Sequence, residues 1–361
     1  MSFTTLTATD FVVSSDSVVA PAWSTGLPTL TGLNMITSSN AASPAPQFYL
    51  DVYDSALTGS SAQVQFSIAY GNELGSGSQL YNNLVNGMSP SRTTYGQYRN
   101  LVYADETMLF NFGIGNTAAR EIVALNIDRN RYKESLQPGT LKLVLTYGPD
   151  VITSGSTTIN LTDDSVYTSN NNLTITYSDA GRVFNLISGS YGEPTSAVLG
   201  GVARGYTPSG SYGFFLPDIG TIILNPRALG LPAVSGGISL FYDNASYGFG
   251  TLPSSSLTNN AVYNALKAGN CFQLNSQETI SANYVFVRIG NQDYNYTNNP
   301  SFLSGSSGQL IYPTLINSPQ TFPTTVGLYN NNGDLLAVAK MSKPLLKDFT
   351  HEALIRVKLD W

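Results

Sequence analysis

Apolar and polar residues alternate along parts of this chain with the two-residue period of a β-strand. In the run Leu354–Trp361, β-branched and aromatic side chains fall on one face, and Arg356, Lys358 and Asp360 fall on the other. The run Val64–Tyr70 alternates in the same way. Such alternation predicts half-buried strands. Because Trp361 falls on the apolar face of the last strand, we expect this end of the chain to be tied into a sheet.

Shorter apolar runs bounded by turn residues extend this pattern over most of the chain. The predicted strands are 48–54, 64–70, 101–103, 122–127, 141–147, 157–164, 173–177, 183–187, 212–215, 221–224, 284–289 and 354–361. Helix signals are few: a short helix within 79–100, one that Asn225-Pro226 begins and Gly230 ends, and one from Asn260 to Lys267. The sequence therefore predicts a mainly β protein with antiparallel, sandwich-like sheets and few short helices.

The spacing of these elements suggests two β units after an N-terminal segment. Residues 1–46 are rich in Ser, Thr, Ala and Pro, which predicts an extended arm lying on a neighbouring subunit, or a loosely ordered terminus. We expect 47–148 and 281–361 to form one discontinuous, sandwich-like domain, because the final strand needs a partner sheet. The turn-rich break near Tyr147–Asp150 then makes 149–280 an inserted β domain.

Composition agrees with a turn-rich β protein and narrows its partners. Charged residues make up 11% of the chain, about half the usual share, so Asn, Ser, Thr, Gly and Tyr must supply the polar surface. Low charge suits surfaces that pack on other subunits, although it also suits an ordinary β protein. The net charge is −6, without a basic block to bind phosphates, and no apolar run is long enough to cross a bilayer. We expect no nucleic-acid or membrane partner. The N-terminus lacks the features of a secretory signal, so we expect cytosolic synthesis.

Catalytic chemistry has few candidates. His351 is the only histidine and Cys271 the only cysteine, so one chain can form neither a Cys/His zinc site nor an intrachain disulfide. A Ser–His–Asp triad would have to use His351, which lies in a polar bridge between predicted strands. The glycine-dense segment 71–78 lacks the lysine of a phosphate-binding loop, which favours a loop between strands.

Two acidic doublets and several aromatic residues leave alternatives open. The doublets Asp105-Glu106 and Asp163-Asp164 cannot face each other across a sugar, because adjacent strand residues point to opposite sides. Loop oxygens at Asp163 and Asp164 could hold Ca²⁺, although an EF-hand ligand series is lacking. Aromatic side chains could form a sugar-stacking surface, but at strand spacing they are more often core. The candidates for stacking are Tyr212, Phe214, Tyr242 and Tyr247. We expect no enzyme activity, no catalytic residue, no cofactor and no metal.

Four segments of the last eighty residues match a recognisable pattern. They are Y-N-Y-T-N-N-P-S-F-L (294–303), T-V-G-L-Y-N-N-N-G-D-L-L-A-V-A-K (325–340), K-P-L-L-K-D (343–348) and L-I-R-V-K-L-D (354–360). They are similar to F-N-Y-S-x-N-P, V-G-L-Y-x-x-x-x-E-L-L-A-V-A-K-L-S-x-P-x-K-K and L-x-V-x-L-D-aromatic, a pattern of virion structural proteins of tailed bacteriophages with long contractile tails, including T4-like cyanophages. Residues 212–225 resemble the family's Y-G-L-x-Y-P-D-x-G-x-x-x-L-N element. Asp334 stands where the family often has Glu, and Trp361 where it has Tyr or Phe.

The resemblance covers the last eighty residues well and 182–229 moderately, and it implies a role in assembly. We expect a non-enzymatic subunit of the phage tail or baseplate, located in the virion, whose partners are fibre-attachment or other virion proteins and its own copies. A neck or capsid position, or a contractile injection particle, is the alternative within this class. A carbohydrate-binding or depolymerising receptor module is the alternative from another class. The expected subunit-contact residues are Tyr294, Tyr296, Leu328, Tyr329 and Trp361.

Overall fold

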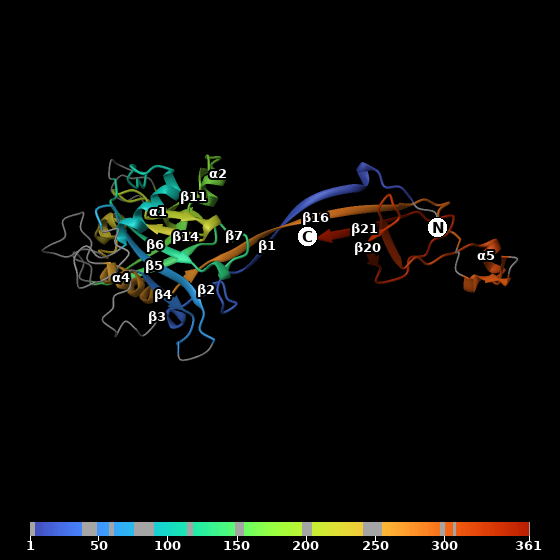
Figure 1. The fold of residues 1–361 in the computed structure, drawn as a ribbon, viewed down its shortest axis with the longest axis horizontal. Helices are drawn as coiled ribbons and strands as arrows, with labels where there is room; N and C mark the ends of the chain where they lie inside the picture. The colour runs from blue at the N-terminus through green and yellow to red at the C-terminus, as the bar shows by residue number, and fades with distance from the viewer. Residues whose placement is uncertain are drawn as a thin grey trace. The chain divides into compact units, whose positions relative to one another are not determined.

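The computed structural model divides the chain into two compact units. Val18–Glu278 form the central unit, and Met1–Ser17 together with Thr279–Trp361 form the terminal unit. Figure 1 shows the helices and strands of both. The residues that the structure describes are 4–37, 49–57, 61–75, 90–113, 118–148, 155–196, 204–240, 255–296, 300–305 and 308–360.

The central unit is built on one large sheet whose described strand pairs are all antiparallel. Its strand order is β2 (Thr29–Leu30), β15 (Phe272–Gln273), β8 (Lys142–Tyr147), β9 (Thr157–Asp163), β11 (Gly181–Ser190), β13 (Gly213–Leu216), β14 (Thr221–Leu224), β6 (Glu121–Ile127), β5 (Val64–Asn72), β4 (Tyr49–Tyr53) and β3 (Ile36–Thr37). The short strands β10 (Thr176–Ser178) and β12 (Glu193–Pro194) pair with β11. The expectation of a mainly antiparallel β protein is confirmed.

This sheet curls, so that strands far apart in its order face each other across a core. The rings of Phe66 on β5 and Phe272 on β15 lie edge to face, with their centroids 5.2 Å apart. Trp23 contacts both rings, and its indole N–H donates to the Phe272 carbonyl oxygen at 2.9 Å. Helix α4 (Ser255–Gly269) adds Val262 and Leu266, both fully buried. Each such side chain contributes about 2–3 kcal/mol by leaving water.

A second apolar layer covers the opposite face of the sheet. Helix α1 (Ser91–Tyr103) buries Tyr95 and Tyr98 in a cluster with Phe110, Phe112 and Phe214. The ring centroids of Tyr95 and Phe110 are 5.2 Å apart in an edge-to-face contact. The sheet of the central unit therefore has apolar packing on both faces.

The remaining helices are short. They are η1 (Ala8–Asp10), η2 (Gly32–Asn34), η4 (Arg129–Arg131), α2 (Ser165–Asn170), η5 (Pro217–Ile219), α3 (Pro226–Leu229), η6 (Ala233–Ser235), η7 (Pro300–Phe302) and α5 (Thr314–Asn317). The helix predicted after Asn225 is confirmed, because its side chain accepts a hydrogen bond from the Arg227 N–H at 3.1 Å.

The terminal unit has little core. Its main sheet follows the order β1 (Phe11–Pro21), β16 (Asn275–Ile289) and β21 (Ala353–Asp360), of which Phe11–Ser17, Thr279–Ile289 and β21 belong to this unit. The first residues of β16 belong to the central unit, where they pair with β7 (Ser135–Leu136). Two hairpins complete the terminal unit: β17 (Leu303–Ser304) with β18 (Gln309–Leu310), and β19 (Thr325–Tyr329) with β20 (Leu335–Lys340). Among the described residues of this unit, the buried hydrophobic side chains are Ala282, Val285, Ile289 and Val357.

The last strand confirms the alternation in the sequence. Ile289 pairs with Ala353 and Ala282 with Asp360, so β21 lies along eight residues of β16. Val357 is buried, whereas its neighbours Arg356 and Lys358 are exposed. The predicted end of the strand, Trp361, lies outside the described residues.

The observed division differs from the expected one in two ways. Residues 47–148 share a sheet with 149–278, because β6 pairs with β14, and not with 281–361 as expected. The segment 1–46 is not an arm throughout its described part: β1 belongs to a sheet, and Trp23 and Leu30 are buried in the central core. A few large apolar side chains fix this segment, although its average composition is polar.

For one element, the predicted type of secondary structure is wrong. Residues 101–103, predicted as a strand, form the last turn of α1. The helix ends at Ala104, which adopts a left-handed backbone with φ +51°. Leu101, Val102 and Tyr103 pack against the buried aromatic cluster beneath the helix. Tertiary packing therefore outweighs the strand preference of this apolar triplet.

Candidate functional site

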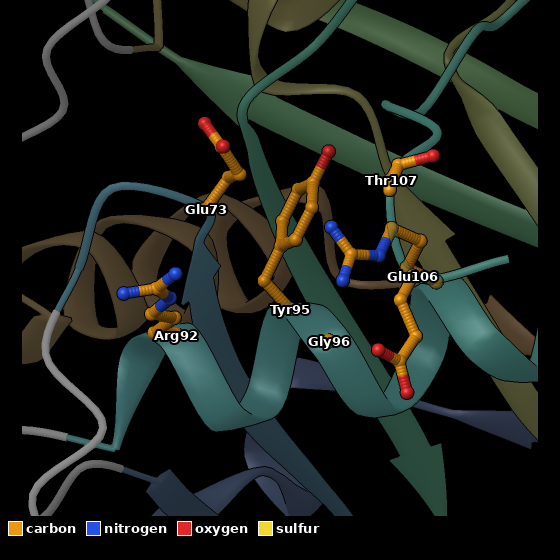
Figure 2. Close-up of a pocket in the computed structure, with 7 residues that line it drawn as sticks. Glu73, Arg92, Tyr95, Gly96, Glu106 and Thr107 are labelled. Carbon is orange, nitrogen blue, oxygen red and sulfur yellow. The ribbon is translucent and has the colours of Figure 1, made fainter.

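A cavity of about 300 Å³ lies on the exposed side of α1 in the central unit. Glu73, Arg92, Arg99, Glu106 and Thr107 line it, together with Tyr95 and Gly96 of the helix (Figure 2). Gly96 leaves the space open, because a Cβ at this position would meet no atom within 4 Å. Glu73 comes from the glycine-dense segment 71–78, of which 76–78 lie outside the described residues.

Two polar groups of this cavity, those of Tyr95 and Glu73, already take part in the structure of the unit. The Tyr95 hydroxyl donates to the Ala119 carbonyl oxygen at 2.7 Å and accepts from the Phe110 N–H at 3.1 Å. Burial raises the pKa of this hydroxyl. Glu73 forms an ion pair with Arg120 at 3.1 Å. The cavity thus combines groups of opposite charge with a tyrosine that two hydrogen bonds hold in the structure.

The doublet Asp163-Asp164 is buried and holds the ends of loops. Asp163 accepts the Gly139 N–H at 2.9 Å, and Asp164 accepts the backbone N–H and the side-chain amide of Asn185 at 2.9 and 2.8 Å. Burial raises the pKa of both carboxyl groups. Their different partners agree with the expectation that adjacent residues point to opposite sides.

The other reactive side chains have ordinary surroundings. His351 is exposed, and its Nδ1 lies 2.6 Å from Asp348 Oδ1. Hydrogen bonds from Thr350 and then from His351 lower the pKa of Asp348. Cys271 is half-buried, and burial raises the pKa of its thiol. Asp218 forms an ion pair with Arg182 at 2.5 Å.

The aromatic residues considered for sugar stacking do not form an exposed platform. Tyr212 is fully buried and its hydroxyl donates to the Gly236 carbonyl oxygen at 2.6 Å. Phe214 is also buried, with its ring centroid 4.8 Å from that of Phe112. Both belong to the core, which was the alternative interpretation, and Tyr242 and Tyr247 lie outside the described residues.

Within the described part of the chain, no cluster of three or more His, Cys, Asp and Glu side chains could hold a metal ion. The same residues contain no helix that is long and apolar enough to cross a membrane.

Exposed apolar side chains concentrate in the terminal unit, which makes its surface the candidate functional site. Large hydrophobic residues that remain well exposed there are Phe11, Val12, Val13, Tyr294, Tyr296, Ile311, Tyr312, Ile316, Phe322, Tyr329, Leu335, Leu336, Val338, Leu346, Phe349 and Leu354. Only four hydrophobic side chains are buried among the described residues of the same unit. Scattered exposed apolar residues are normal, but a surplus over the core in one unit marks an interaction surface.

The β19–β20 hairpin carries the most regular part of this surface. Its turn is fixed by the Asn330 side chain, whose Oδ1 accepts the Asp334 N–H at 2.8 Å and the Asn332 N–H at 3.0 Å. Gly333 supplies the left-handed backbone, with φ +86°, that such a tight turn requires. The sequence Asn330-Asn-Asn-Gly-Asp334 therefore sets the register of the two strands.

The hairpin exposes four large apolar side chains, here called the hairpin surface: Tyr329, Leu335, Leu336 and Val338. The register shifts between Leu328 and Tyr329, where Leu336 is an extra residue on β20. In the register of the hairpin, Tyr329 pairs with Leu335 and Gly327 with Val338. A Cβ on Gly327 would lie 2.9 Å from Tyr329 Cε2, so the tyrosine ring rests against the glycine backbone. Leu336 and Val338 are 69% and 59% exposed. These side chains give the hairpin an exposed apolar area.

A buried lysine anchors the loop that carries two of the predicted contact residues. Lys347 is fully buried, and its ammonium donates to Asn295 Oδ1, to the Asn291 carbonyl oxygen and to the Asp348 carbonyl oxygen at 2.8–2.9 Å. Asn295 is buried between Tyr294 and Tyr296, both of which are exposed. Polar contacts hold this part of the unit in place of an apolar core.

The contact residues predicted from the sequence that the structure describes lie in two places. Tyr294 and Tyr296 flank the anchored Asn295, and Leu328 and Tyr329 lie on β19, where Leu328 is half-buried and Tyr329 is exposed. Trp361 lies outside the described residues. Sequence reasoning missed Leu335, Leu336 and Val338, although an apolar run next to the tight turn 330–334 was a visible signal for them.

Comparisons with known proteins do not add a family to these observations. No protein-family model matches the chain, and neither a curated protein nor a solved structure is significantly similar to it. The resemblance to phage virion proteins therefore stays a prediction.

Proposed function

We propose that this chain is a non-enzymatic structural subunit of a phage virion, in the tail or baseplate, that assembles through contacts made by its terminal unit. The observation that carries the proposal is the imbalance in that unit, where exposed apolar side chains outnumber the buried ones. A unit of this kind gains stability when a neighbour covers its surface, because burial releases about 25 cal/mol for each Å² of apolar area.

The position of the sequence resemblance supports the same proposal. It is strongest from Asn283 to the C-terminus, and the terminal unit includes Thr279–Trp361. Its longest motif, 325–340, spans the β19–β20 hairpin and therefore the hairpin surface. The residues on which a virion role was inferred are thus the residues that expose apolar surface.

The candidate acids and aromatic residues give little support to a catalytic function. Of the acids that a test for a depolymerase would change, Asp163 is fully buried, and Asp218 forms an ion pair with Arg182. The stacking platform expected of a sugar-binding module is not formed by Tyr212 or Phe214. The proposed mechanism is therefore structural: low-charge surfaces pack on neighbouring subunits and exclude water.

Antibodies against the central unit, used for immunogold labelling of purified particles, test the proposal. We expect label at the tail or baseplate, with a fixed number of copies for each particle by quantitative mass spectrometry. Label at the neck or capsid would move the subunit within the virion. A chain that is missing from purified particles and releases reducing sugar from a polysaccharide would contradict the proposal.

A further inference from the structure

Arg99, on helix α1, carries a charge that no described residue pairs. It lines the cavity on this helix and is half-buried. Within the described part of the chain its guanidinium forms no hydrogen bond or ion pair, and its Nε is buried. The Tyr95 ring supports it from one side, with 5.8 Å between Arg99 Cζ and the ring centroid. Because buried polar groups are nearly always hydrogen-bonded, an unsatisfied guanidinium at a cavity is suited to bind a ligand.

The carboxylates near Arg99 have other partners or do not pair with it. Glu73 forms its ion pair with Arg120 at 3.1 Å. Asp105 accepts three hydrogen bonds from the residues that follow it, the shortest at 2.6 Å. Glu106 lines the cavity, but it forms no ion pair with any described residue. These acids balance much of the positive charge around the cavity, so they disfavour a ligand with more than one negative charge.

Gly96 keeps the floor of the cavity bare. It lies next to Tyr95 in the interior of α1 (Figure 2), where glycine is less favourable than any residue but proline. A Cβ at this position would meet no atom within 4 Å, so packing against the described residues does not require a glycine. A ligand that lies against the helix backbone gives the missing side chain a physical reason, because glycine permits close approach.

We propose that this cavity binds the carboxylate of a small organic acid. The planar guanidinium of Arg99 matches the two oxygens of a carboxylate, and the rest of the ligand lies over Gly96. Arg92, two helical turns before Arg99 and on the rim of the same cavity, adds a second positive charge. A volume of about 300 Å³ lies at the lower end of the range of ligand sites and fits a small molecule.

The inference goes beyond the proposed function, which concerns the terminal unit, and it stands or falls separately. Phosphate is the matched comparison for the ligand class, because its second negative charge meets Glu73, Asp105 and Glu106.

Nuclear magnetic resonance titration of the full chain with acetate, succinate and benzoate at constant ionic strength tests the proposal. We expect a saturable shift of the Gly96 and Arg99 amide signals with at least one of these acids, and a weaker response to inorganic phosphate. No saturable shift with any of the three acids, or a stronger response to phosphate, would overturn the proposal.

Variants of the two cavity residues assign the binding. Arg99→Gln should weaken the binding of the responding acid by about tenfold or more, because a charged hydrogen-bond partner is lost. Arg204→Gln, at an exposed position elsewhere in the central unit, is the matched control and should bind as the wild type does. Gly96→Ala retains the helix and narrows the cavity, so it should weaken binding several-fold. Unchanged binding in both Arg99→Gln and Gly96→Ala would place the acid elsewhere and contradict the inference.

Discussion

Different interactions stabilise the central and terminal units. In the central unit a curled sheet closes over Phe66, Phe272 and Trp23, which are buried from both sides. In the terminal unit a buried ammonium and its oxygen partners anchor one loop, and most large apolar side chains remain exposed. Under the proposed function this difference is a division of labour, in which the central unit carries the apolar core and the terminal unit carries the surface that neighbours cover.

The largest effect expected is the loss of a central aromatic. Trp23→Ala removes a buried indole and leaves the Phe272 carbonyl oxygen without its donor. We expect the free energy of unfolding of the central unit to fall by about 4 kcal/mol. Leu336→Ala, at an exposed position in the terminal unit, is the comparison. It should change the free energy of unfolding by less than about 0.5 kcal/mol. Urea unfolding followed by circular dichroism measures both, and similar losses would remove the contrast between the units.

The second effect tests whether polar contacts replace a core in the terminal unit. Lys347→Met keeps the buried chain but leaves the oxygens of Asn291, Asn295 and Asp348 without the ammonium, which should cost about 2 kcal/mol. Lys343→Met, at an exposed position, is the control. Hydrogen exchange should accelerate around 290–295 and 345–350 in the first variant alone. Unchanged exchange there would mean that the lysine is not an anchor.

The two units should also respond to pH with opposite signs. Burial raises the pKa of Asp163 in the central unit, so its contribution to stability is present below the unfolded pKa and is lost as the pH rises through the folded pKa. Hydrogen bonds from Thr350 and His351 lower the pKa of Asp348 in the terminal unit, so its contribution is present above the unfolded pKa and is lost as the pH falls.

Variants separate these two effects from other titrating groups. As the pH is lowered from about 7 to about 4, the wild type should gain stability relative to Asp163→Asn, and below about pH 4 it should lose stability relative to Asp348→Asn. Unfolding measured at several pH values gives both differences. The same sign for both would show that the two carboxyl groups are not in the contrasting environments described above.

The smallest effect concerns the cavity on α1. Gly96→Ala should raise the stability of the central unit by about 0.5–1 kcal/mol, because alanine favours a helix and its Cβ meets no neighbour. If the cavity has no role in assembly, particles carrying this variant should form normally. Loss of particle formation with an intact fold would move the functional site from the terminal unit to this cavity.

Local pattern predicted the strands well where one face is buried along a long run. The runs at 64–70 and 354–361 correspond to β5 (Val64–Asn72) and β21 (Ala353–Asp360). The pattern failed where a contact between residues far apart in the sequence determines the structure. Trp23 is surrounded by polar residues in the sequence, and its partner Phe272 lies 249 residues away. Contacts of this range also explain why the grouping of segments into units could not be predicted from the spacing of strands.

The candidate site was predictable in part. The loop 330–334 between two apolar runs was a signal for the hairpin, which the predicted strands left out, and Tyr329, one of the expected contact residues, is exposed on it. Lys347 was not identified, because a lysine in K-P-L-L-K-D reads as a surface charge until the oxygens of 291–295 are placed around it. Local sequence cannot show which polar residues meet in a unit without an apolar core.

Covalent footprinting of the free chain and of intact particles tests the central claim most directly. Tyr329, Leu335 and Val338 of the hairpin surface should be labelled in the free chain and protected in the particle. Exposed side chains scattered over the central unit, such as Tyr177 and Tyr191, should on average lose less labelling on assembly. Equal labelling of the hairpin surface in both states would contradict the claim that the terminal unit is completed by its neighbours.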